Sequence, residues 1–374
     1  MGLAAVAAHI ATPFTSQAGE GSGLYVSCRR EAYGRFAAVI FDRVGDEKVL
    51  PLPARGHDLA LRPGDDDCVV FARRPGTFAC AFAARGHSAA TTFGAMPGRH
   101  FNGHGVFSTD GRVLYSTEND VAGDAARGVI GIRDATANFQ HIGEFDSAGL
   151  DPHDMAHLTD GRTLVVANGG IDTDPESGRI SLNLATIQPS LVYIDMHTGD
   201  IVEKHMLPAH LHKLSIRHLA VGRGDVVIFG CQHEGPAADF PPLIGFHARG
   251  AEPVLVEAPR AVHRDFRNYI GSVSRDRSGE IAAALSPRAG LVAFFDVSTF
   301  RYLGEHRLSD VCGLAGTGGK GDFVLTNGEG RVERVDASGQ ARETLRPACR
   351  VSWDNHLIAI DSESASRASS LAPR

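Results

Sequence analysis

The chain has 374 residues, of which 43% are hydrophobic, and it carries a formal charge of −7 at pH 7. This length and apolar content suffice for a large buried core, and acidic and basic residues are interspersed without the basic runs typical of nucleic-acid binding. Because no apolar stretch reaches the roughly 18 residues of a membrane-spanning helix, we expect neither nucleic-acid binding nor a membrane span.

Residues 1–20 are rich in alanine and other small residues and reach Ser-Gln-Ala before a glycine-rich break. They resemble the apolar and cleavage regions of a secretory signal whose positively charged start is missing. A disordered, alanine-rich start would have the same composition. The six cysteines lack metal-finger spacing, and they leave the redox compartment open.

A strand hairpin recurs along the chain. It reads GHDLALRPGDDDCVVFARR from Gly56, GHGVFSTDGRVLYST from Gly103 and PHDMAHLTDGRTLVVANGG from Pro152. Each copy joins two apolar strands across a turn rich in Asp and Gly. Weaker copies start at Ile216, Tyr269 and Val311, and a partial one, NHLIAI, starts at Asn355. Seven copies indicate a repeat architecture.

Two further strand-like runs between hairpins, such as GVIGIRD and NFQHIGEF, give four strands per unit. Equivalent positions in successive copies lie 41 to 64 residues apart, which brackets the length of a propeller blade. The longest interval contains an extra loop at residues 167–190.

The chain begins with three strands, LYVSCRR, FAAVIFD and EKVLPLP, that have no inner strand before them, and it ends just after the seventh inner strand. Joining the two ends would complete one blade and remove exposed sheet edges. We therefore predict an all-β fold, a seven-bladed β-propeller closed by a blade that the N- and C-terminal segments share. It forms one domain over residues 21–362, followed by a disordered tail at 363–374.

Polar residues are segregated within these repeats. In a propeller, the loops that enter the innermost strands and the loops between the second and third strands emerge on one face. The opposite turns carry ordinary turn residues. The first set of loops carries His57, His104, His153, Arg217 and His356, and the second carries Arg73, Arg74, Glu118, Asn119, Asn168, Gln232, Glu234, Arg288 and Asn327. Polar groups gathered on one face of a rigid scaffold predict a binding site.

Several short strings, among them RHFNGHGVFSTDG, LYSTEND, LNLATIQPSLVYID, LSIRHLA and GCQHEGPA, resemble the bacterial domain-of-unknown-function family numbered 1513 over residues 24–360. The resemblance implies a seven-bladed propeller exported to the periplasm, often by a twin-arginine signal, and encoded beside iron-uptake components and c-type haem proteins. It implies no established reaction. The arginine pair of such a signal is missing before Gly2, which departs from the family pattern.

The first interpretation of the polar face is a metal site. His356, His57, His104 and His153 fall in four consecutive blades, since the seventh blade abuts the first. Imidazole binds Fe, Cu and Zn well, and carboxylates such as Glu118 and Asp154 could serve as further ligands or orient the histidines. Alternatively, each histidine ties its loop to the neighbouring blade through a hydrogen bond.

The second interpretation, compatible with the first, is a site for a small anion. Arginine side chains bind carboxylates through two parallel hydrogen bonds. The donors would be Arg73 or Arg74, Arg217 and Arg288, with Asn119, Asn168 and Gln232 completing the contacts. Alternatively, these arginines pair with local acids such as Glu118 and Glu234 and form a self-satisfied network.

The sequence thus predicts a periplasmic protein that binds a small anionic ligand or a transition metal at one mouth of its channel. The implied role is that of an accessory in bacterial iron acquisition, with iron-uptake or c-type haem proteins as partners. A protein-interaction platform without a small-molecule site is one alternative, and a metal-dependent hydrolase or oxidoreductase is another. No nucleophile elbow or Ser-His-Asp order occurs, so enzymatic activity stays open. The extra loop, with Asp172, Asp174 and Glu176, is either a cap or partner contact or a plain surface insertion.

Overall fold

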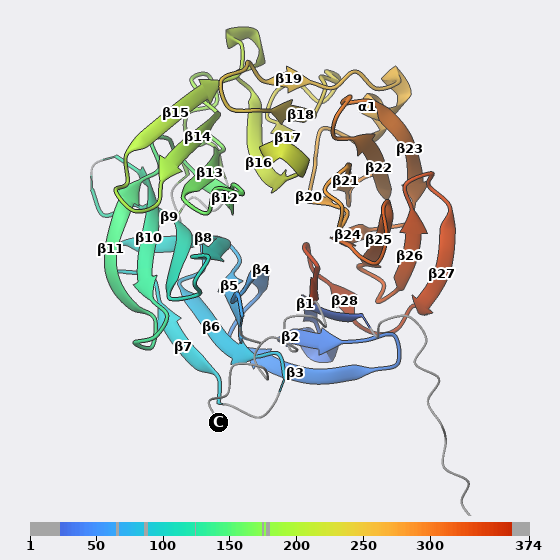
Figure 1. Cartoon of the computed structure of the whole chain (residues 1–374), viewed down its shortest axis with the longest axis horizontal. Helices are drawn as coiled ribbons and strands as arrows, with labels where there is room; N and C mark the ends of the chain where they lie inside the picture. Colours follow the sequence, from blue (N-terminus) through green and yellow to red (C-terminus); the bar gives the residue numbers. More distant parts are fainter. Residues whose placement is uncertain are drawn as a thin grey trace, which may run out of the picture.

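Seven β-sheets are arranged in a ring around a common central axis in the computed structural model (Figure 1). The structure describes residues 23–360 except 65–66, 86–88, 124, 174–175 and 177–179. Successive strands within each sheet pair antiparallel, and the sheets follow one another around the ring in chain order. This arrangement confirms the predicted seven-bladed propeller. The expected signal segment at 1–20 and the expected tail at 363–374 lie outside the described residues.

Six blades contain four consecutive strands each, with the first strand innermost. They are β4 (Gly56–Leu61), β5 (Asp67–Ala72), β6 (Phe78–Ala83) and β7 (Thr91–Gly94); β8 (Arg99–Phe107), β9 (Val113–Asp120), β10 (Arg127–Asp134) and β11 (Gln140–Asp146); β12 (Pro152–His157), β13 (Thr163–Asn168), β14 (Ser190–Asp195) and β15 (Ile201–Met206); β16 (Leu214–Val221), β17 (Val227–His233), β18 (Ile244–His247) and β19 (Val254–Leu255); β20 (Ser272–Arg275), β21 (Ile281–Ser286), β22 (Leu291–Asp296) and β23 (Tyr302–Arg307); β24 (Val311–Gly316), β25 (Asp322–Asn327), β26 (Val332–Asp336) and β27 (Ala341–Arg346).

The remaining blade joins the two ends of the chain. It contains β1 (Leu24–Arg30), β2 (Phe36–Phe41) and β3 (Asp46–Leu52), and its innermost strand is supplied in two pieces, β28 (Ser352–Trp353) and β29 (Ile358–Ile360). Both pieces pair antiparallel with β1, Trp353 opposite Arg29 and Ile358 opposite Val26. The predicted shared blade is therefore confirmed.

Helical segments are short and lie in the connections. They are α1 (Arg260–Asp265) and the single turns η1 (Ala32–Gly34), η3 (Ala209–Leu211) and η4 (Arg223–Asp225). Within the described ranges, none of the helices has the length and apolar character needed to cross a membrane.

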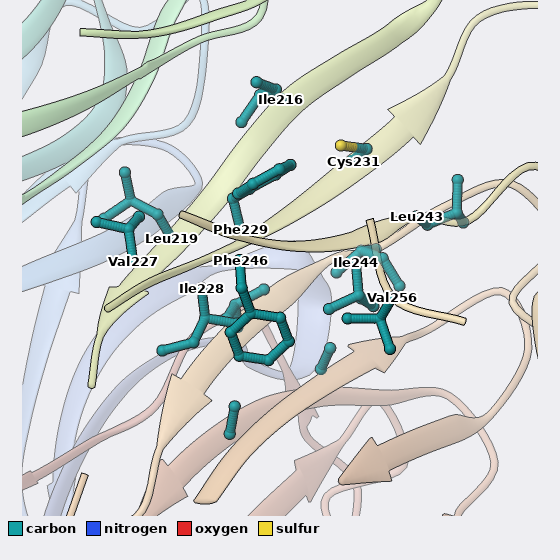
Figure 2. Packing of buried hydrophobic residues seen from close by; sticks show 14 of the residues in the cluster. Ile216, Leu219, Val227, Ile228, Phe229, Cys231, Leu243, Ile244, Phe246 and Val256 are labelled. Atoms are coloured by element: carbon teal, nitrogen blue, oxygen red, sulfur yellow. The ribbon is translucent and has the colours of Figure 1, made fainter. Parts of the chain in front are cut away.

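Packing between neighbouring blades forms the core. Side chains alternate between the two faces of a strand, and both faces of a blade are covered, so middle strands such as β13, β14 and β21 are buried at every residue. Figure 2 shows one such layer, in which Phe229 and Phe246 pack among aliphatic residues of β16 to β18. Each fully buried side chain of this size contributes about 1.5–3 kcal/mol. The outermost strands β3 and β15 expose alternate residues at the rim.

Most of the innermost strands are irregular at one point. The pairing with the second strand shifts around His57 in β4, His104 in β8, His153 in β12, Arg217 in β16 and Cys312 in β24. Such a β-bulge places two residues opposite one and re-aims side chains. In the shared blade, His356 lies in the gap between β28 and β29, where strand pairing is likewise interrupted. The four predicted histidines and Arg217 thus lie at breaks in the pairing of the innermost strands.

The closure of the ring predicts the effect of shortening the chain. Deletion from Cys349 onward removes β28 and β29 and leaves β1 without its inner neighbour. We expect this variant to lose its cooperative thermal transition, measured by circular dichroism, because an unpaired inner edge opens a ring whose blades are stabilised by their neighbours. A chain ended after residue 362 serves as the control and should melt like the full chain. Equal melting of both truncated chains would contradict the closure.

Candidate functional site

Five histidines converge where the inner strands meet the channel. His57, His104, His153 and His218 come from β4, β8, β12 and β16, and His356 comes from the gap between β28 and β29. Neighbouring rings around the cluster have centroids 4.8–5.0 Å apart. The structure thus brings together the four histidines predicted from the sequence and adds His218, which that analysis did not select. We call these five residues the histidine cluster.

His218 escaped the sequence analysis because the bulge in β16 lies one residue before it. Arg217 occupies the place equivalent to His57 and His153, while His218 occupies the place equivalent to Asp58 and Asp154. The signal was present in the aligned strings GHDLA, PHDMA and IRHLA. In each string the second residue was selected as a site residue, and the third residue is also polar. At a bulge, both neighbouring residues can face the channel.

Close packing next to the cluster depends on Gly103. Its φ is +105°, and a Cβ atom at this position would lie 2.4 Å from Cδ2 of His57. A side chain would therefore be strained by its own backbone and would also displace the His57 ring. This is why the string FNGHG places a glycine before the ring histidine.

His104 is the most deeply buried member and is held by two carboxylates. Its Nδ1 lies 2.9 Å from Oδ2 of Asp58 and 3.4 Å from Oδ1 of Asp154. Burial by itself lowers the pKa of His104, but these two carboxylates outweigh burial and raise that pKa to about 10. The carboxylates thus fix the orientation of the ring through Nδ1. The other ring nitrogen, Nε2, has no hydrogen-bond partner in the described structure.

The other four rings are neutral at pH 7. Burial lowers the pKa of His57, His153 and His218 well below the ordinary value, and neighbouring histidines and arginines lower it further. Burial also lowers the pKa of His356. A neutral imidazole has one lone pair available to a metal ion.

Several ring nitrogens in the cluster have no hydrogen-bond partner among the described residues. They are Nδ1 of His57, Nε2 of His104, Nδ1 of His218 and Nε2 of His356. Hydrogen bonding accounts for only part of the cluster: His356 Nδ1 lies 3.3 Å from Oγ of Ser272, and His153 Nδ1 lies 3.4 Å from a guanidinium nitrogen of Arg217. An unsatisfied buried polar atom costs about 1–3 kcal/mol, so four of them in one cluster call for an explanation.

The spacing of the nitrogens suits metal ligation. Within each of two trios, His57–His104–His356 and His104–His153–His218, one ligand nitrogen per ring lies within 4.8 Å of the others. Three nitrogens spaced evenly around one ion at about 2.1 Å lie about 3.6 Å apart, so an inward movement of roughly 0.7 Å per nitrogen suffices. The residues present therefore fit a transition-metal ion.

A cavity of about 510 Å³ opens beside the histidine cluster. His57, His153 and His218 form part of its wall. Six predicted ligand-binding residues also line it, namely Arg73, Arg74, Arg217, Gln232, Glu234 and Arg288. The remaining wall includes Arg55, Asn102, Tyr269, Asp310 and Asn355, which the sequence analysis did not select.

Two buried carboxylates hold most of the cavity arginines. Asp151 accepts from Arg74 at 2.6 Å and from Arg217 at 2.5 Å. Asp354 accepts from Arg55 at 2.9 Å and from Arg73 at 3.1 Å. Burial alone would raise the pKa of Asp151, but Arg217 and Arg74 outweigh it and hold that pKa below the ordinary value. The acids that pair with these arginines are thus Asp151 and Asp354, and not the expected Glu118 and Glu234.

Four predicted site residues lie in the interiors of the blades and do not line this cavity. Glu118 is fully buried and forms an ion pair with Arg133 at 2.6 Å. Asn119 accepts a hydrogen bond from Asn102, at 3.1 Å, while Asn168 donates to the carbonyl oxygen of Ser147. Asn327 caps the turn between β25 and β26. The side chains of these four are engaged in buried contacts, because the ends of β9, β13 and β25 face neighbouring strands, and their role in a site stays a prediction.

The extra loop predicted at residues 167–190 connects β13 and β14 and reaches the cavity. Ile171 and Ser181 lie in the cavity wall. Asn183 anchors the loop by accepting from the backbone N–H of Asp172 at 2.8 Å and donating to the carbonyl oxygen of Gly170 at 2.9 Å. Asp174, one of the acidic residues singled out in the sequence, lies outside the described residues.

We expect the metal-free protein to lose stability as the pH falls below the ordinary histidine pKa of about 6.5. The unfolded chain then takes up protons at His57, His153 and His218, whereas burial keeps these rings neutral in the folded state. Each such ring lowers the free energy of unfolding by up to about 1.4 kcal/mol per pH unit. Urea unfolding in a chelator should therefore show a shallower pH slope for the double variant His57→Ala, His218→Ala, and equal slopes would contradict the assignment.

Glu118 provides a test of a purely structural role. Truncation in Glu118→Ala leaves Arg133 as an uncompensated charge in the blade interior, and we expect a loss of about 3–5 kcal/mol in the free energy of unfolding. Urea titration measures this loss. If the folded fraction also binds less metal or anion than the wild type, Glu118 contributes to a site after all.

Comparisons with known proteins agree with the fold. Hydrazine synthase of Kuenenia stuttgartiensis is similar in structure, with a TM-score of 0.62 and 13% sequence identity over 86% of this chain and 94% of that chain. This likeness concerns the fold alone. No curated protein is similar enough in sequence to count as a match. The model of the family described as "Protein of unknown function (DUF1513)" matches residues 50–360, most of the chain. This protein therefore belongs to the DUF1513 family.

Proposed function

We propose that this propeller binds a transition-metal ion in the histidine cluster and that the adjacent cavity gives a small molecule access to that ion. The observation that carries the proposal is the set of four buried ring nitrogens without hydrogen-bond partners, gathered within one cluster of five histidines. Metal ligation would give such nitrogens a partner, whereas the hydrogen-bonding alternative leaves them unpaired.

The chemistry of the donors narrows the choice of ion. Imidazole nitrogens favour Fe, Cu, Zn or Ni over the hard ions Mg²⁺ and Ca²⁺, which prefer oxygen ligands. Asp58 and Asp154 support this choice, since a ligand histidine commonly donates its other ring N–H to a carboxylate. A metal ion would have to displace the proton on Nε2 of His104, and these two acids would then accept from the remaining N–H and orient the ring.

The cluster has one side that opens onto the cavity. His104 and His356 are absent from the cavity wall, while His57, His153 and His218 line it. A metal site with such an opening can accept an exchangeable ligand, as catalytic and transport sites do, whereas purely structural sites are closed. This supports a binding or reactive role over a role in stability alone.

Export to the periplasm and a role beside iron-uptake or c-type haem proteins belong to the same proposal. Family resemblance supports them, and a site rich in histidine is compatible with handling iron or copper. A metal-dependent oxidoreductase or hydrolase would use the same open site. The described structure favours neither reaction over simple binding.

Metal binding can be measured directly. Chelator-treated full-length protein is titrated with Fe²⁺, Cu²⁺ or Zn²⁺ by calorimetry, and bound ion is counted by elemental analysis after desalting. We expect retention of one or more ions by the wild type and at least a tenfold loss of affinity in His57→Ala, His218→Ala. This variant removes one member of each trio, and both removed rings border the existing cavity.

His212→Ala is the matched control, because His212 is a surface residue outside the cluster whose Nδ1 contacts only the carbonyl oxygen of Ala209 within the described structure. It should bind metal like the wild type. Equal retention by the double variant and the wild type, or no retention by either, would overturn the proposal and leave hydrogen bonding between blades as the role of the cluster.

A further inference from the structure

We propose that the cavity binds a small molecule bearing a carboxylate or phosphate group, with the oxyanion held between Arg73, Arg217 and Arg288. This inference deepens the proposed function by naming the class of molecule that would lie beside the metal. The position of this molecule beside a metal ion rests on the proposed function. Its contacts with the arginines do not require a metal ion.

The ion pairs of the cavity involve four of its five arginines. Asp151 is shared by Arg74 and Arg217, and Asp354 is shared by Arg55 and Arg73. The fifth, Arg288, stacks on the ring of Tyr269 at 4.5 Å and has no ion-pair partner among the described residues. Its positive charge is therefore available to an anionic ligand.

Two of the arginines also retain unused donors. Nε of Arg73 and Nε of Arg217 are buried and lack a hydrogen-bond partner within the described ranges. The Arg217 side chain is only 6% exposed, yet it forms part of the cavity wall. Both side chains line the cavity, and a guanidinium group can offer two parallel N–H bonds to a carboxylate or phosphate.

The rest of the cavity suits an organic anion better than a bare ion. Its volume of about 510 Å³ lies within the usual range for small-molecule sites. Ile171 and Pro287 supply apolar wall, and Gln232 and Ser181 supply polar contacts. Glu234 and Asp310 also line the cavity, so the oxyanion must lie away from them, and they can accept hydrogen bonds from hydroxyl groups on the same molecule.

Arg217 connects the two parts of the site. One of its guanidinium nitrogens lies 2.5 Å from Asp151 and 3.4 Å from Nδ1 of His153. An anion held by Arg217 would therefore lie beside the histidine cluster. Binding of the anion and of the metal ion should strengthen each other, because opposite charges attract strongly at a partly buried site.

The experiment uses full-length protein, both metal-free and metal-loaded, titrated by calorimetry with succinate and, separately, with inorganic phosphate. We expect at least one probe to bind the wild type and to bind Arg288→Gln at least tenfold more weakly. Arg288 is the test position because, among the described residues, it has no ion pair whose loss would destabilise the fold. Arg301→Gln is the matched control: it removes the same charge at an exposed residue outside the cavity and should bind like the wild type.

The outcomes separate this inference from the metal proposal. Binding of only one probe assigns the oxyanion as carboxylate or phosphate. If Arg288→Gln loses anion binding but retains metal like the wild type, the inference is supported. This result holds whatever the His57→Ala, His218→Ala variant shows about metal binding. Failure of the wild type to bind either probe, or equal weakening by Arg288→Gln and Arg301→Gln, overturns the anion site whether or not metal is bound.

Discussion

The candidate site depends on the pairing of β1 with β28 and β29, which closes the ring. This pairing places His356, from the far end of the chain, beside His57 of the neighbouring blade β4–β7, with ring centroids 4.8 Å apart. The same segment supplies Asp354, which holds two arginines of the cavity. One contact between chain ends therefore closes the propeller and completes both the histidine cluster and the arginine cavity.

Irregular backbone at the channel converts an ordinary propeller into a polar site. The bulges in β4, β8, β12 and β16 and the gap that holds His356, at a φ of +73°, all aim side chains toward one place. β20 pairs with β21 in regular register and contributes Ser272, which approaches His356. Such departures from regular pairing cost free energy, and they concentrate where a site needs particular side-chain directions.

Charge at the site falls into two adjacent groups. One group is the five imidazoles, of which His104 has its pKa raised by Asp58 and Asp154. The other is the guanidinium groups of the cavity wall, which Asp151 and Asp354 neutralise in part. Imidazoles next to arginines favour a cation and an anion in adjacent places, which is the arrangement expected for a metal ion with an anionic ligand.

The sequence by itself determined the fold: the seven hairpin copies, their spacing and the unpaired strands at the start required a closed ring. It also placed four histidines at the same position of successive repeats, and such residues occupy equivalent places around the ring. The tertiary structure decided the rest. His218 joins the cluster because a bulge shifts its strand by one residue, whereas Glu118, Asn119, Asn168 and Asn327 turn into blade interiors. Repeat alignment fixes where a residue lies along a strand, but backbone irregularity and contacts between distant segments fix where its side chain points.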